Sequence, residues 1–195
     1  MKKTKTLPIL SFKSAAAWEK WLADYHATSG GIWLRFFKKN SGIATVSHAE
    51  ALDEALCYGW IDGQVQKYDA KSWLYKFTPR RAKSIWSKRN IEHVTRLCKA
   101  KKMKPSGLKQ VEAAKADGRW ARAYDAPSAM QVPADFLREL AKDKKAEAFF
   151  KTLNKANTYA IAWRLQMAKK PETREKRMKV LLEMMAKGEK LHPST

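Results

Sequence analysis

The stretch ALCYGWIDGQVQKYDAKSWLYKFTPRRAKSIWSKRN, residues 55–90, decides the fold. A helix that ends at Gly59 leads into two segments, 60–68 and 72–78, in which apolar and polar side chains alternate as in strands. The short connection at 69–71 joins them as a predicted antiparallel hairpin. Pro79 ends the second strand, and Ser87 is placed to cap another helix. The hairpin therefore carries the chain from one helix to the next.

Side chains of a strand alternate between its two faces, and this period of two assigns the aromatic residues of the hairpin. The residues predicted to share a face of the first strand are Trp60, Asp62, Gln64, Gln66 and Tyr68. Those predicted to share a face of the second strand are Trp73, Tyr75 and Phe77. If these two sets of residues lie on the same face of the sheet, the Asp62 carboxylate is surrounded by aromatic side chains.

The order strand, Pro79, Arg80, Arg81 and a helix start at Ser87 indicates an anion site. Guanidinium groups and the unpaired amides of a first helical turn both suit a phosphate or carboxylate. Alternatively, the two arginines pair with a structural carboxylate such as Asp62 or remain solvated. The predicted ligand-binding residues are Tyr58, Trp60, Asp62, Phe77, Arg80, Arg81, Trp86, Ser87 and Asn90.

Working outward, the sequence predicts an α+β fold. Upstream lie a short strand at 7–12, a helix capped by Ser14, a strand at 32–39 with both faces covered, and a capping box from Ser47 to Glu50. Downstream, helices are expected at 87–101 and 105–118, and every later element reads as helical. We expect a small mixed or antiparallel sheet with packed helices over 1–120, a linker at 121–132 and an all-helical segment at 133–195.

Charge constrains the partners. Forty Lys and Arg against nineteen Asp and Glu give a formal net charge of +21, which favours an anionic small molecule or a phosphate-bearing ligand. The same charge predicts weak, salt-sensitive binding to nucleic acid without sequence preference. The basic cluster formed by Lys169, Lys170, Arg174, Lys176, Arg177 and Lys179 is interpreted as a solvated face. No membrane span is predicted, a cytoplasmic location is expected, and the sequence does not indicate an oligomeric state.

The sequence contains few candidate catalytic or metal-binding residues. Cys57 and Cys98 lie inside helical patterns and are expected to be reduced, and the four histidines lack metal-ligand spacing, so neither a metal nor a cofactor is predicted. An enzyme would have to use Asp62 as a general base or Cys57 as a nucleophile. Cys57 is near a helix C-terminus, which disfavours a thiolate, and the sequence favours a binding protein over an enzyme.

Several segments together resemble a known family. ALCYGWIDG, FTPRRAKSIWSKRN, MKPSGL, DGRW and AKKPETREKR resemble the bacterial YdeI/OmpD-associated family, also described as bacteriocin-protection proteins. The resemblance implies a stress- or bacteriocin-protection role and supplies no catalytic mechanism. Three classes of function stay open: an anion-binding protective protein, a non-specific nucleic-acid binder, and an enzyme that uses Asp62.

Overall fold

The computed structural model describes residues 6–125, 129–168 and 170–192. The chain divides into two units, residues 1–123 and 124–195, and each is described by itself. Residues 126–128 of the predicted linker lie outside the described part of the chain, as does Lys169 of the predicted basic cluster.

The N-terminal unit is built on a four-stranded sheet in the order β1-β2-β4-β3. β1 pairs in parallel with β2, whereas β2 with β4 and β3 with β4 pair antiparallel, so the sheet is mixed. The strands are β1 (Ile9–Leu10), β2 (Ile32–Phe37), β3 (Trp60–Lys67) and β4 (Ser72–Pro79). With the helices below, this confirms the predicted α+β class and the hairpin.

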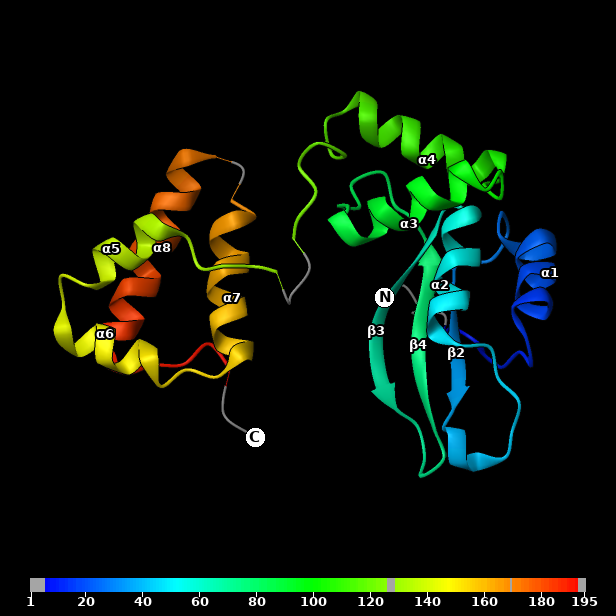
Figure 1. Cartoon of the computed structure of the whole chain (residues 1–195), viewed down its shortest axis with the longest axis horizontal. Helices are drawn as coiled ribbons and strands as arrows, with labels where there is room; N and C mark the ends of the chain where they lie inside the picture. Colours follow the sequence, from blue (N-terminus) through cyan, green and yellow to red (C-terminus); the bar gives the residue numbers. More distant parts are fainter. Residues whose placement is uncertain (1–5, 126–128, 169, 193–195) are drawn as a thin grey trace. The chain divides into compact units, whose positions relative to one another are not determined.

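Helices lie against one face of this sheet and beyond one end of it (Figure 1). They are α1 (Ala15–Tyr25), α2 (His48–Cys57), α3 (Lys88–Lys99) and α4 (Pro105–Ala116), with a 3₁₀ turn, η1, at Lys39–Ser41. The Ser47 hydroxyl accepts from the Glu50 amide while the Glu50 carboxylate accepts from the Ser47 amide, which is the predicted capping box at the start of α2. Figure 1 shows α2 in front of the strands, and α3 and α4 beyond one end of them.

Aromatic side chains form the centre of the core between the sheet and the helices. Trp18 of α1 is fully buried, meets the Phe77 ring edge-on at 5.7 Å, and donates from its indole nitrogen to the Ala51 carbonyl of α2 at 3.0 Å. Trp60 packs edge-on against Trp18 and donates to the His26 carbonyl at 3.1 Å. The buried indole N–H groups of Trp18 and Trp60 therefore both have a hydrogen-bond acceptor.

A β-bulge changes the faces of β3. Asp62 is opposite Phe77, but Val65 is opposite Tyr75, so two residues of β3 stand against one of β4 between these pairs. The predicted shared face of β3 is therefore wrong beyond Asp62, because the extra residue reverses the alternation. Gln66 lies opposite Leu74, on the other side of the sheet from Tyr75.

Two glycines let α4 approach the end of α2. Gly59 leaves α2 with φ +78°, a left-handed conformation, and delivers the chain into β3. At Gly107, a Cβ would lie 2.2 Å from the Cys57 carbonyl oxygen, so only glycine fits this contact. The Lys104 amide donates to the same oxygen at 3.1 Å, which satisfies a carbonyl at the C-terminal end of α2.

The C-terminal unit is helical, as predicted. Its helices are α5 (Ala134–Leu140), α6 (Lys144–Lys151), α7 (Lys155–Gln166) and α8 (Pro171–Lys187). Their core contains Phe136, Ile161, Leu165, Leu181 and Met185, all buried. Asn154 caps α7 through the Asn157 amide, and Gly188 ends α8 with φ +72°.

We predict that Gly107→Ala lowers the free energy of unfolding by about 2–4 kcal/mol, because the added methyl group must push α4 away from the α2 carbonyl. The matched control is Gly30→Ala, whose Cβ would meet no atom within 4 Å, so its free energy of unfolding should be unchanged or slightly higher. Urea denaturation of both variants measures the difference. Equal stability of the two variants would contradict the close contact.

Candidate functional site

The structure buries most of the predicted ligand-binding residues. Seven of the nine are less than 9% exposed: Tyr58, Trp60, Phe77, Arg80, Trp86, Ser87 and Asn90. Tyr58 donates to the Glu19 carboxylate at 2.7 Å, and burial together with this bond raises the pKa of Tyr58. Ser87 caps α3 by accepting from the Asn90 amide, as expected for a helix N-cap. Asp62 and Arg81 are the two members of the set that retain substantial contact with solvent.

Asp62 lies beside a histidine that the sequence did not connect to it. Its Oδ2 atom is 3.1 Å from Nε2 of His48, the first residue of α2, and both side chains are half-buried. The His48 ring lies against Tyr75, with 4.2 Å between the ring centroids. In the described residues, His48 is the one side-chain hydrogen-bond partner of Asp62. Asp62 does lie beside aromatic rings on the predicted face, since it is opposite Phe77.

The two arginines of the PRR segment lie in different environments. Arg80 is 7% exposed, its guanidinium carbon is 3.6 Å from the centre of the Trp86 ring, and it donates to the Ile85 carbonyl at 3.2 Å. This geometry is a stacked cation–π contact in the interior. Arg81 is exposed, and its backbone amide donates to the Ser84 hydroxyl at 3.0 Å.

The other proposed catalytic group is unsuited to nucleophilic attack at neutral pH. Cys57 is buried, and burial, followed by the nearby Glu54 and Asp53 carboxylates, raises its pKa to about 12. A thiol with this pKa stays protonated near neutrality. Asp53 itself binds the side chains of His93 and Arg96 on α3.

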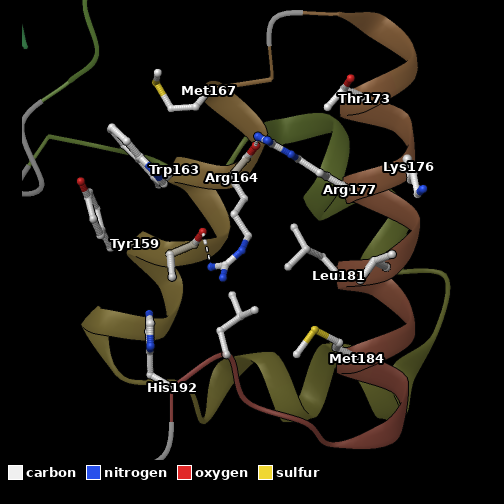
Figure 2. A pocket seen from close by; sticks show the side chains of 13 residues that line it. Tyr159, Trp163, Arg164, Met167, Thr173, Lys176, Arg177, Leu181, Met184 and His192 are labelled. Carbon is white, nitrogen blue, oxygen red and sulfur yellow. Dashed lines mark hydrogen bonds between the residues drawn. The ribbon is translucent and has the colours of Figure 1, made fainter. Parts of the chain in front are cut away.

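The C-terminal unit contains a large pocket between α7, α8 and the chain that follows α8. Its volume is about 750 Å³. Figure 2 shows Tyr159 and Trp163 on one side, Leu181 and Met184 on the other, and the Arg164 side chain extending between the two helices. The remaining lining residues are Ala160, Met167, Thr173, Lys176, Arg177, Val180, Leu191 and His192.

Every lining residue that carries a full charge is basic. Arg164, Lys176 and Arg177 line the pocket, and no described acidic residue does. Arg177 donates to the Arg164 carbonyl at 2.7 Å, and Arg164 donates to the Ala160 carbonyl at 3.5 Å. Both guanidinium groups bond to backbone carbonyls, which leaves their charge available to an anion. The interpretation of Arg177 as solvated is therefore wrong, because it joins α8 to the end of α7.

One wall of the pocket is fixed by a buried asparagine. Asn157 donates to the His192 carbonyl at 3.2 Å and accepts from the His192 amide at 2.9 Å, so the segment after α8 is held against α7. Because the two residues are 35 positions apart in the chain, the sequence alone does not indicate this pairing. The nearest signal is Asn157 itself, an amide side chain in the first turn of α7.

Family comparisons divide the chain in a similar way. Residues 10–110 match the model of a domain of unknown function, DUF8412, which covers more than half of the chain. The chain belongs to the DUF8412 family. Residues 129–188 match the family described as "Bacteriocin-protection, YdeI or OmpD-Associated", which confirms the predicted YdeI/OmpD-associated assignment. No curated protein and no solved structure matches the chain.

The two matches separate the features that sequence analysis had joined. The stretch 55–90, which carried most of the resemblance, falls within the DUF8412 match, whereas the pocket between α7 and α8 is lined mainly by residues of the YdeI/OmpD-associated match. Within the described ranges, no helix is long and apolar enough to cross a membrane. The same residues contain no group of three or more His, Cys, Asp or Glu side chains placed to hold a metal ion.

Arg80 and Arg81 should respond differently to replacement by alanine. We predict that Arg80→Ala lowers the free energy of unfolding by about 1–3 kcal/mol, because it removes a buried side chain stacked on Trp86. Arg81→Ala, a change at an exposed position, should stay within about 0.5 kcal/mol of the parent protein. Thermal or urea denaturation of the two variants checks this, and an equal loss in both would refute it.

Alkylation distinguishes the two cysteines. With a pKa of about 12, roughly one Cys57 thiol in ten thousand is ionised near pH 8. Iodoacetamide should therefore modify the exposed Cys98 and spare Cys57 in the native protein, as read by mass spectrometry of peptides. Both should react after denaturation. Modification of native Cys57 at the rate of Cys98 would contradict its buried, protonated state.

Proposed function

We propose that the protein binds a small amphipathic organic anion in the pocket between α7 and α8. The observation that carries this proposal is a pocket of about 750 Å³ whose charged lining is entirely basic. Pockets of about 300–1,000 Å³ hold ligands of drug-like size, and this one is large enough for a two-ring molecule. The ligand binding would serve the protective role that the family description names, by sequestering a toxic or stress-related compound in the cytoplasm.

The lining specifies a ligand with two chemically different ends. Tyr159 and Trp163 stack at 6.1 Å between centroids, and together with Leu181 and Met184 they supply an aromatic and aliphatic surface. Burying an apolar ligand body against such a surface contributes about 25 cal/mol per Å². Arg164 supplies a charge-assisted donor for an acidic group, with Arg177 nearby. A carboxylate or sulfonate on an aromatic body fits this combination.

Two fluorescent probes of similar shape and different charge test the proposal. 8-Anilinonaphthalene-1-sulfonate carries the anionic group, and N-phenyl-1-naphthylamine has nearly the same aromatic body without it. We expect the sulfonate to bind at least about tenfold more tightly to the parent protein, because a charged hydrogen bond contributes about 1.5–3 kcal/mol. Arg164→Gln should remove most of this preference and leave the affinity for the neutral probe nearly unchanged.

Lys179→Ala is the matched control, because Lys179 is an exposed cation on α8 that does not line the pocket. It should leave both affinities within about twofold, in line with a weak effect of a distant screened charge. Circular dichroism of each variant verifies that α7 and α8 are intact. The proposal would be contradicted if the parent protein bound both probes equally tightly. It would also be contradicted if the Arg164 and Lys179 variants lost equal affinity for the sulfonate.

A further inference from the structure

A second, smaller hollow lies on the β3–β4 hairpin, in the N-terminal unit. Its volume is about 340 Å³, and it is lined by Gly63, Gln64, Lys76, Thr78, Pro79, Arg81 and Ser84. Lys76 and Thr78 alternate with the buried Phe77, so they lie on the face of the sheet opposite the aromatic core. The hollow therefore occupies the side of the hairpin turned away from α1 and α2.

The β-bulge explains why space exists at this point. Gly63 and Gln64 of β3 together stand against Lys76 of β4, and Gly63 has no side chain to cover the strand. A Cβ at Gly63 would have its nearest contact at 3.7 Å, with the Lys76 carbonyl oxygen, which is an ordinary van der Waals distance. The site can therefore be filled by substitution without forcing the two strands apart.

The polar groups around the hollow suit an anion. Lys76 and Arg81 are its charged lining residues, and in the described part of the chain neither makes a salt bridge with a carboxylate. The Lys76 ammonium is 5.9 Å from the centre of the Trp33 ring. The Ser84 hydroxyl accepts a hydrogen bond from the Arg81 amide at 3.0 Å, so its own proton can point to a ligand. Thr78 supplies a second hydroxyl.

We propose that this hollow binds the phosphate group of a phosphorylated small molecule. Two cations match the charge of a phosphomonoester, which approaches −2 at neutral pH, and two hydroxyl donors complement its additional oxygens. A carboxylate offers one charge and two oxygens, so it would leave part of the site unused. A nucleic-acid phosphodiester also carries a single charge per phosphate, and a strand needs an extended groove, whereas this hollow has a volume of only about 340 Å³.

Isothermal titration of the full chain with phenyl phosphate, benzoate and a short oligothymidylate tests the site at physiological ionic strength. We expect phenyl phosphate to bind more tightly than benzoate, and Lys76→Ala and Arg81→Ala each to weaken it about tenfold or more. Gly63→Leu should abolish the binding by filling the hollow. Lys83→Ala, which removes an exposed cation of the same loop outside the lining, should change it by less than about twofold.

Three outcomes would overturn the proposal. If the Lys83 and Arg81 variants lost equal affinity for phenyl phosphate, the binding would be due to the overall positive charge of the loop and not to this hollow. Unchanged affinity in the Gly63→Leu variant, with its fold verified by circular dichroism, would place the ligand elsewhere. Tighter binding of oligothymidylate than of phenyl phosphate would indicate a nucleic-acid surface instead. Arg164→Gln is expected to leave the affinity for phenyl phosphate unchanged. The test of this hollow and the test of the C-terminal pocket can therefore fail independently of each other.

Discussion

The N-terminal unit depends on the close contact between the end of α2 and the start of α4. Gly107 rests on the Cys57 carbonyl, and Gly59 turns the chain out of α2 in a left-handed conformation. Because β3 begins directly after this turn, the contact fixes where Trp60 enters the core and where Asp62 meets His48. A side chain at either glycine would collide with backbone atoms, which cannot move away as a side chain can.

Basic charge is used differently in the two units. In the C-terminal pocket, Arg164 and Arg177 bond to backbone carbonyls beside an aromatic surface, so the site combines charge with apolar area. In the hairpin hollow, Lys76 and Arg81 lie among hydroxyl groups and backbone, so polar recognition dominates. An excess of 40 basic over 19 acidic residues leaves many cations without a carboxylate partner, and concave positions can direct that charge to a ligand.

Several aromatic side chains of the stretch 55–90 lie in the core and not on the protein surface. Trp60, Phe77 and Trp86 are almost fully buried, and Arg80 is buried with them by stacking on Trp86. A motif rich in tryptophan and arginine resembles a binding site in sequence, because both residue types are common at interfaces. Here the Arg80 guanidinium is stacked on Trp86 inside the protein, and the exposed neighbour Arg81 is the arginine that faces solvent.

The sequence by itself determined the local elements: the capping box of α2, the hairpin, and the caps at Ser14 and Ser87. These follow from hydrogen bonds and periodicities within a few residues. Only the tertiary structure decided the His48–Asp62 pair and the hydrogen bonds between Asn157 and His192. It also decided on which face of the sheet each β3 residue after the bulge lies. The first two join residues distant in the chain. Gly63 inside the strand is compatible with a bulge but does not fix its register, so packing settles which face each later residue occupies.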